Sequence, residues 1–373
     1  MISKNIALAG EITPAKTFIP IIERLMELEK ENKLNFKINK MIGLYHGESA
    51  KDFLKPYCDE LYYIGEGRRG KKNSKPKLVY LISRDILKSF NALRGKNVDL
   101  LITAGNAGDV RKSIVAANIL RIPVIHIEQD IYNPIEVISQ ANLVTVPSQE
   151  YKEYLKNNYK LDNVVNINGY PMAKYVDDYI RDNNLIDKEE IYAKYGMEDF
   201  VLVVLGGDLK DGDIDPLIKS IEKLDRNVLI APYRFDRNMV EKLVSSSRIK
   251  VLPQYVDLLS FMNAASQLIY AAGMGMTIEA GVFNIPSLKI EGFHQTHGSV
   301  DLAKTLNIPI VKIDEIPEAF ENLAPQNDTS LLEDSENSIE KVVNIINEFN
   351  PKSLKRSGFK STKEIWNSRK AFR

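Results

Sequence analysis

Four short stretches combine glycine with small or polar residues directly after an apolar run. They are AGEITPA (9–15), TAGNAGD (103–109), GGDLKDG (206–212) and AAGMGMT (271–277). Glycine lets backbone N–H groups approach an anion closely, and a following helix adds its positive N-terminal end. These turns are therefore suited to holding phosphate groups, although tight turns also occur for structural reasons alone.

Two carboxylates stand next to these turns. Glu279 follows the fourth turn inside an apolar segment, and a carboxylate can accept hydrogen bonds from both hydroxyls of a ribose. Its alternative role is that of an exposed acid near a helix N-terminus. Glu11 lies in the first turn, where it can serve as a general base or merely cap the following helix.

Short apolar runs alternate with longer amphipathic segments, which predicts parallel β-sheets covered by helices on both faces. In such sheets, ligands bind beyond the carboxyl ends of the strands, where the four glycine turns fall. The expected strands are 5–10, 38–44, 60–65, 98–104, 122–127, 143–146 and 164–169, followed by 200–207, 227–233, 249–253, 267–273, 285–290 and 308–313.

The composition bounds the class of protein. A chain of 373 residues, 44% hydrophobic and 27% charged, predicts two globular domains, with a linker-like polar stretch at 177–190. Lys and Arg balance Asp and Glu at 50 each, so the net charge gives no reason to expect a nucleic acid partner. The single Cys58 suits a reducing compartment, and neither a signal peptide nor a spanning segment is recognisable. A cytoplasmic location is expected.

Several common sites are excluded by spacing. None of the turns fits the Gly-x-Gly-x-x-Gly dinucleotide fingerprint or the Walker A loop, which argues against a dehydrogenase and an ATPase. His294 and His297 lack an acidic cluster, and Asp211, Asp213 and Asp215 lack the spacing of a calcium loop. No metal is expected, and His126, within an apolar strand, is expected to be a core residue.

The order of the motifs resembles that of GT-B glycosyltransferases that use UDP-sugars. Within them, it is most similar to the peptidoglycan lipid-intermediate N-acetylglucosaminyltransferases (the MurG family). The resemblance rests on GEITPA (10–15), GRRGKK (67–72), VDLLITAGNAGD (98–109), IPVIHIEQD (122–130), INGYPM (167–172), VLGGDLKDG (204–212), QYVDLL (254–259) and AGMGMTIEAGVFNIP (272–286).

This resemblance implies an α/β protein with the GT-B fold, in which two Rossmann-like, doubly wound parallel-sheet domains face a cleft. The acceptor-side domain would span 1–172, the UDP-sugar domain 173–351, and a helix in 352–373 would pack back on the first domain. The implied reaction transfers a sugar, an N-acetylhexosamine, from a UDP-sugar to an acceptor hydroxyl. It would invert the anomeric centre and need no metal or cofactor besides the UDP-sugar donor.

The resemblance also assigns residues. The candidate catalytic acids are Glu11, where the family has a histidine, and Glu128. The acceptor-side positions are Gly10, Thr13, Gly105, Asn106 and Gly108. The donor-binding positions are Gly206, Gly207, Tyr255, Val256, Gly273, Met274, Gly275, Glu279, Lys174 and Gln295.

Departures from the family pattern point to a different sugar or acceptor. Ala173 replaces an arginine, which leaves Lys174 as the nearest cation for a phosphate. Asp208 replaces the serine of the phosphate turn and would repel a diphosphate unless it points away. Gln295 and His297 stand near the family's sugar-binding glutamine pair.

A basic patch precedes an apolar run in the first half of the chain. Arg68, Arg69, Lys71 and Lys72 stand shortly before the segment 78–82, and the alternative to a binding surface is a solvated loop. The match to the family's membrane-facing loop favours an anionic membrane surface and a lipid-linked acceptor in cell-envelope glycan synthesis. The expected location is then peripheral, on the inner face of the cell membrane.

Two other functions remain open. The non-hydrolysing UDP-N-acetylglucosamine 2-epimerases share the fold, and 8–25 resembles their opening segment, while Glu128 matches one of their catalytic acids. Their His-Arg-x-Glu-Asn segment is absent, however, and Asn106 replaces an aspartate. The third possibility is a catalytically silent protein that binds a nucleotide sugar on this fold.

Overall fold

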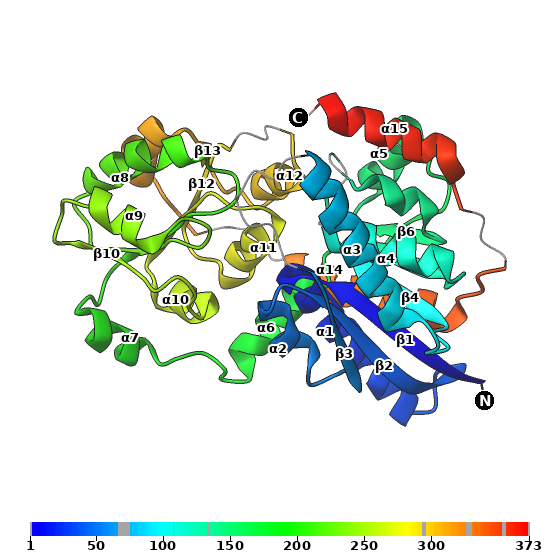
Figure 1. Cartoon of the computed structure of the whole chain (residues 1–373). Coiled ribbons are helices and arrows are strands. Elements are labelled where there is room, and N and C mark those ends of the chain that lie inside the picture. The colour runs from blue at the N-terminus through cyan, green and yellow to red at the C-terminus, as the bar shows by residue number, and fades with distance from the viewer. Residues whose placement is uncertain are drawn as a thin grey trace. The chain divides into compact units, whose positions relative to one another are not determined.

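The computed structural model describes residues 2–65, 75–106, 108–130, 132, 134–292, 296–325, 330–352 and 356–371 (Figure 1). The chain forms two compact units. The first contains Met1–Tyr175 and Glu333–Arg373, and the second contains Val176–Leu332. Each unit is described separately below.

The first unit is built on a seven-stranded parallel sheet in the order β3-β2-β1-β4-β5-β6-β7. The order changes direction between β1 and β4. Its strands are β1 (Ile2–Gly10), β2 (Phe36–His46), β3 (Glu60–Gly65), β4 (Leu100–Ala104), β5 (Val124–Ile127), β6 (Leu143–Val146) and β7 (Val164–Asn166).

Helices cover both faces of this sheet because alternate strand residues point to opposite sides. In β1, Ile6 and Leu8 pack into one apolar cluster, while Ala7 and Ala9 pack into the other. The Ile6 face is covered by α1 (Ile12–Lys30), α2 (Ser49–Leu54) and α14 (Ser330–Glu348), and the Ala7 face by α3 (Lys75–Leu93), α4 (Gly108–Ile119), η1 (Glu136–Gln140), α5 (Gln149–Tyr159) and α15 (Gly358–Ala371).

The second unit repeats this architecture with six parallel strands in the order β10-β9-β8-β11-β12-β13. They are β8 (Val201–Val204), β9 (Val228–Ala231), β10 (Ile249–Val251), β11 (Gln267–Tyr270), β12 (Ser287–Ile290) and β13 (Ile310–Val311). Its helical segments are α7 (Lys188–Tyr195), η2 (Asp211–Asp213), α8 (Ile214–Glu222), α9 (Arg237–Leu243), α10 (Leu258–Ala264), α11 (Met274–Phe283), α12 (Gly298–Thr305), η3 (Ile313–Glu315) and α13 (Ile316–Phe320).

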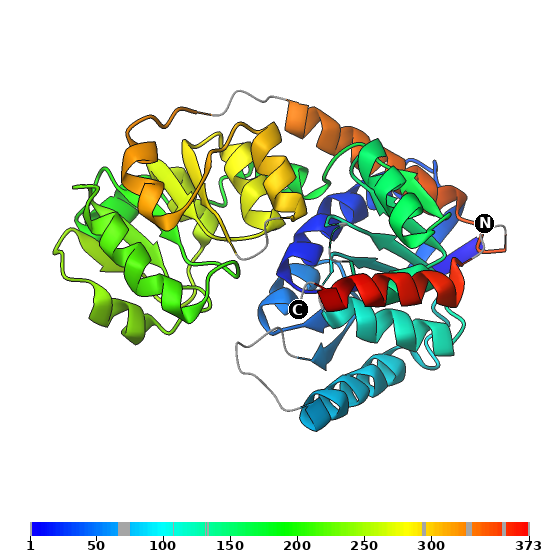
Figure 2. The ribbon, with the colours of Figure 1, turned by 90° about the horizontal axis from the view of Figure 1, so that it is seen from above.

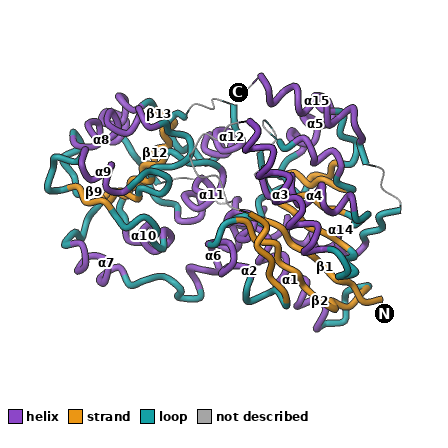
Figure 3. Tube along the Cα trace, viewed as in Figure 1, coloured by secondary structure: helices purple, strands orange, loops and turns teal. Residues whose placement is uncertain are grey.

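Figure 3 shows the alternation of strands and helices that the apolar runs predict. The predicted α/β class, with two Rossmann-like parallel sheets, is confirmed. Among the described residues, no helix combines the length and apolar character needed to cross a membrane.

The boundary between the units differs from the predicted one at the C-terminal side. Residues 333–351, expected in the second domain, belong to the first unit because the apolar face of α14 packs into the first core. Val342, Val343 and Ile346 are fully buried there, and Arg24 of α1 forms an ion pair with Glu340 at 2.5 Å. Farther along, α15 contacts η1 and α5, and Figure 2 shows it lying along the first unit.

The packing of α14 leads to a stability prediction. Ile346→Ala should destabilise the first unit by about 2–5 kcal/mol, because it removes a fully buried side chain and leaves a cavity. Trp366, the one tryptophan of the sequence, lies in α15 and can report unfolding of this unit by fluorescence in urea. Asn344→Ala, at an exposed position of the same helix, is the control. If both variants unfold at the same urea concentration, the packing of α14 into the first core is contradicted.

Candidate functional site

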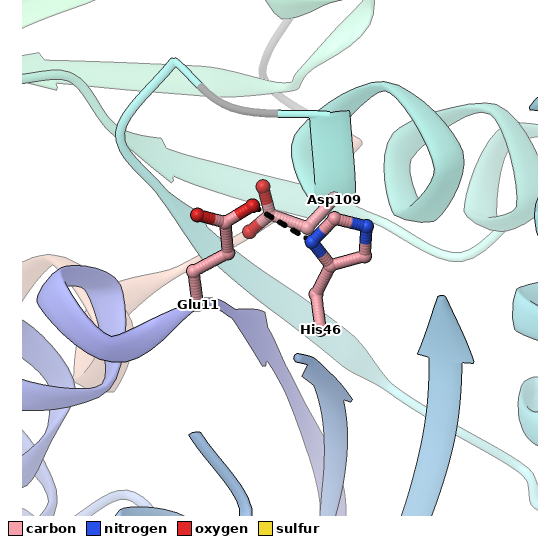
Figure 4. Close-up of side chains that lie close together, drawn as sticks. All are labelled: Glu11, His46 and Asp109. Carbon is pink, nitrogen blue, oxygen red and sulfur yellow. Dashed lines mark hydrogen bonds and ion pairs between the residues drawn. The ribbon is translucent and has the colours of Figure 1, made fainter. Parts of the chain in front are cut away.

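In the first unit, polar side chains gather where the strand order changes direction. Glu11 follows β1, His46 ends β2, and Asp109 is the second residue of α4, which follows β4. The carboxyl ends of these parallel strands meet at one edge of the sheet, the usual place for ligands in such folds. One carboxylate oxygen from Glu11, one from Asp109 and one ring nitrogen from His46 lie within 4.8 Å of one another (Figure 4).

Glu11 does not cap the helix that it precedes. It occupies the N-cap position of α1, but its side chain makes no capping hydrogen bond. Instead Glu11 Oε1 lies 2.8 Å from Nδ1 of the buried His46, and the Glu11 side chain keeps 30% of its surface exposed. Of the two roles expected for Glu11, capping is therefore wrong, and the side chain remains accessible to a ligand.

A buried ion pair between Lys112 and Asp85 contacts the ring nitrogen of His46 that does not face Glu11. Lys112 Nζ lies 2.7 Å from His46 Nε2 and 2.7 Å from Asp85 Oδ2 of α3. Burial acts to raise the pKa of Asp85, but the hydrogen bonds and charges of Lys112 and Arg84 outweigh it and leave this pKa lowered. Gly65 makes room for the pair, because a Cβ there would lie 2.5 Å from Asp85 Oδ2, and its φ of +148° also disfavours other residues.

Asp109 is the most enclosed member of the group. Its side chain has no solvent exposure, and no side chain among the described residues donates a hydrogen bond to either carboxylate oxygen. Burial, followed by the negative charge of Glu11, raises the pKa of Asp109 well above its usual range. Asp109 therefore favours the protonated state.

Glu128, the other predicted catalytic acid, is enclosed by its own turn. It is 1% exposed, and its Oε1 accepts the backbone N–H groups of Gln129 and Asp130, both at 2.9 Å. Its Oε2 lies 3.3 Å from His126, which is fully buried and contacts Thr103, as expected for a core histidine. This geometry stabilises the end of β5 and leaves little of Glu128 for a ligand to contact.

The predicted acceptor-side positions lie at the same edge of the first sheet. Gly10 ends β1 where a Cβ would overlap Pro14, and Gly105 has a φ of +74°. Thr13 lies in the first turn of α1, and Gly108 begins α4. Asn106 donates to Asp130 Oδ2 at 3.1 Å.

In the second unit, two glycine turns also flank the point where the strand order changes direction, between β8 and β11. Gly206 and Gly207 follow β8, and a Cβ on Gly206 would overlap the carbonyl oxygen of Ala271. Gly273 is the N-cap residue of α11, followed by Met274 and Gly275. Glu279, in the second turn of that helix, is buried at 5% exposure.

The aspartate of the predicted phosphate turn has a buried cation beside it. Asp208 Oδ2 lies 3.3 Å from Nζ of Lys289, which is 1% exposed and also donates to the Ala272 carbonyl at 2.6 Å. Burial lowers the pKa of Lys289, and the charge of Asp208 counters this shift only in part. A protonated Lys289 offsets the negative charge of Asp208 at this turn.

The remaining predicted positions are distributed differently. Tyr255 is 76% exposed and Val256 half-buried, both in the loop between β10 and α10. Lys174, assigned to the second domain from the sequence, belongs to the first unit, where its backbone N–H donates to Ser335. His297 caps α12 by accepting the Ser299 N–H at 3.0 Å. Gln295, Arg68, Arg69, Lys71 and Lys72 lie outside the described residues.

Four residues of the site were not predicted from the sequence: His46, Asp85, Asp109 and Lys112. Asp109 and Lys112 stand three residues apart in a helix with several buried apolar residues, and charged residues at buried positions usually have partners. That spacing was the available signal. Their partners Asp85 and His46 are 27 and 66 residues from Lys112, so no local pattern could identify them.

No family model and no curated protein matches this sequence. Solved structures of similar fold exist. A Methanocaldococcus jannaschii UDP-GlcNAc 2-epimerase in complex with UDP-GlcNAc and UDP aligns with a TM-score of 0.67 and 16% identity, over 93% of this chain and 99% of that one. S. aureus MnaA, in a co-structure with UDP, aligns with a TM-score of 0.68 and 16% identity, over 94% and 97%.

The calicheamicin glycosyltransferase CalG4 also aligns, with a TM-score of 0.50 and 12% identity over 99% of this chain and 98% of that one. At these identities the likeness establishes the fold alone, and it supports the predicted GT-B architecture. The two epimerase-named structures align with higher TM-scores than CalG4 does, and the expected closeness to the MurG family is not shown by these structures.

The burial of Asp109 predicts a pH-dependent stability difference. Because its pKa is raised in the folded state, the folded protein binds more protons than the unfolded chain above pH about 4. The contribution of Asp109 to stability is fully present below that pH and is lost as pH rises towards the folded-state pKa.

Asp109→Asn should therefore gain stability relative to wild type between pH 4 and pH 8, as measured by urea denaturation at several pH values. Asp52→Asn, at an exposed position of α2, is the matched control. If the difference in free energy of unfolding between Asp109→Asn and wild type stays constant from pH 4 to pH 8, the assignment of a proton to Asp109 is contradicted.

Proposed function

We propose that this protein is an enzyme that acts on a UDP-linked N-acetylhexosamine. The second unit would hold the nucleotide at its two glycine turns, and the first would supply the proton-transfer group Glu11. The observation that carries the proposal is the Glu11–His46–Asp109 cluster at the strand-order change, because it puts an accessible carboxylate beside a buried acid where this fold binds ligands.

The nucleotide assignment rests on the second unit and on its relatives. Two similar structures contain UDP. In this chain Gly207 and Gly273 are half-buried at the two turns, whereas Gly206 is buried. Backbone N–H groups at such turns would suit a diphosphate, and Glu279 in the second turn of α11 would suit the two ribose hydroxyls. Lys289 would reduce the repulsion between Asp208 and the diphosphate.

For the reaction we favour epimerisation at carbon 2 of the sugar, which the similar structures support better than sugar transfer. Inversion at a carbon that bears hydrogen requires removal of that proton and return of a proton to the opposite face. In this proposal Glu11 removes the proton while the bond between carbon 1 and the UDP oxygen breaks, so that the C–H electron pair forms a double bond between carbons 1 and 2. UDP would then re-add to carbon 1 as a proton returns to the opposite face of carbon 2. The hydrogen bond from His46 keeps the Glu11 carboxylate oriented.

Sugar transfer to an acceptor hydroxyl is the second candidate. It needs only one general base, and two features of the sequence favour it: the absence of the epimerase segment His-Arg-x-Glu-Asn and the presence of Asn106 in place of an aspartate. A lipid-linked acceptor and an anionic membrane surface belong to this candidate and depend on the basic residues at 68–72.

One incubation separates the candidates. UDP-GlcNAc alone in D₂O should give a second UDP-N-acetylhexosamine with deuterium at carbon 2, detected by proton NMR. Release of UDP only after an acceptor is added would instead indicate transfer. Binding of UDP-GlcNAc without deuterium exchange or turnover on any acceptor would indicate a silent binding protein.

Glu11→Gln should lower turnover about 10²–10⁴-fold while leaving UDP affinity intact, because it removes the proton acceptor and keeps the side-chain shape. Glu27→Gln, at an exposed position of the same helix, is the control and should retain the wild-type rate. A wild-type rate in Glu11→Gln would remove Glu11 from the chemical step.

Glu279→Ala should weaken UDP binding by about 1–3 kcal/mol, because the ribose hydroxyls would lose their acceptor in a buried position. Calorimetric titration of UDP against this variant and against Glu321→Gln, an exposed control in the same unit, measures the difference. The ribose assignment fails if Glu279→Ala binds UDP with wild-type affinity.

A further inference from the structure

The hydrogen bonds around His46 define which of its ring nitrogens carries the proton. An ammonium group has donors only, so Lys112 Nζ, 2.7 Å from His46 Nε2, requires that nitrogen to accept. The single proton of the neutral ring then lies on Nδ1 and is donated to Glu11 Oε1 at 2.8 Å. Glu11 must accept this bond, which an ionised carboxylate does best.

The remaining carboxyl group of the cluster is placed to hold a proton. Asp109 is fully buried, it lies within 4.8 Å of Glu11 and His46, and no side chain of a described residue donates a hydrogen bond to its oxygens. Two carboxylates this close rarely ionise together, and burial favours the neutral form of the more enclosed one. Figure 4 shows the Asp109 carboxyl group beside the Glu11–His46 hydrogen bond.

Among the described residues, the charged groups that contact this cluster come from α3 and α4. Lys112 is held by Asp85 Oδ2 at 2.7 Å, and Asp85 Oδ1 in turn accepts from Arg84 at 2.9 Å. Gly65, at the end of β3, leaves the space that the Lys112–Asp85 pair occupies. The backbone is thus shaped around a buried lysine whose second hydrogen bond is to His46.

We propose that Glu11 and Asp109 form a carboxylate–carboxylic acid pair, and that Lys112 is the positioning residue that fixes the tautomer of His46, so that His46 Nδ1–H donates to the Glu11 carboxylate. In the resting pair the one proton is on Asp109. When a ligand proton is transferred, its bond to the ligand breaks, a new O–H bond forms on Glu11, and the bonding electrons remain with the ligand.

The use of this pair on a sugar rests on the proposed function, whereas the pair itself does not. It also argues against a metal at the same three side chains, because His46 Nδ1 would have to lose its proton while Nε2 still accepts from Lys112. The experiments below need no nucleotide, so their failure can be distinguished from failure of the proposed function.

The first experiment determines the tautomer of His46 by NMR of the full chain with nitrogen-15-labelled histidine. The sequence has four histidines, and loss of one signal set in His46→Gln assigns the residue. We expect a neutral ring with its proton on Nδ1 in the wild type at neutral pH. A proton on Nε2, or an imidazolium, would overturn the proposal.

Variants of Lys112 test its positioning role. Lys112→Met should convert the His46 signals to a mixture with the Nε2-protonated form, whereas Lys112→Arg keeps a donor and should retain the wild-type pattern. Lys51→Met, at an exposed position of α2, is the matched control. If Lys112→Met does not fold, the His46 tautomer in the wild type and in Lys112→Arg still tests the proposal. Absence of the Nδ1 proton in either of these two proteins would contradict the positioning role of Lys112.

The second experiment locates the proton on Asp109. Infrared difference spectra between wild type and Asp109→Asn at neutral pH should show loss of one neutral carboxylic acid band, which Asp52→Asn should not affect. Persistence of that band in Asp109→Asn would overturn the pair. A divalent metal found in equimolar amount in the purified protein, and lost in Asp109→Asn, would overturn it as well.

Discussion

The site of the first unit depends on one buried ion pair, between Lys112 and Asp85. A lysine ammonium is costly to remove from water unless its donors are paired, and breaking such a pair by removing one partner typically costs about 3–5 kcal/mol. Here the second partner of Lys112 is His46, so the interaction that makes its burial tolerable also orients the imidazole towards Glu11. The glycine that ends β3 is part of the same constraint, because any side chain there would displace the pair.

A related arrangement occurs in the second unit. Lys289 is buried under a glycine turn and reaches an aspartate, Asp208, and a backbone carbonyl. In both units, therefore, a lysine that is enclosed by the sheet edge compensates acidic groups where the strand order changes direction. In the first unit the buried lysine contacts His46, which is hydrogen-bonded to Glu11, and in the second unit it lies beside a glycine turn.

The sequence predicts the parts of this protein that local pattern determines. All the expected strands are present, because buried parallel strands are continuous apolar runs, and Glu11 and Glu279 could be selected because glycine turns mark the strand ends. The partners of Glu11 could not be selected, since His46, Asp85 and Lys112 meet only through the order of strands in the sheet. The assignment of α14 failed for a similar reason: an amphipathic helix has an apolar face but does not specify which of two cores receives it.

The first unit is formed by two separate stretches of the chain, with the second unit between them. This arrangement has a consequence for biosynthesis. The second unit, Val176–Leu332, is translated before α15 and before the part of α14 that belongs to the first unit. These two segments complete the two faces of the first sheet. Domains commonly fold as units while the chain emerges from the ribosome. Until α14 is translated, one apolar surface of the N-terminal sheet lacks its contacts with Val342, Val343 and Ile346. All the strands of the second unit have been translated by then. The first unit can therefore be completed only after the second unit has been translated.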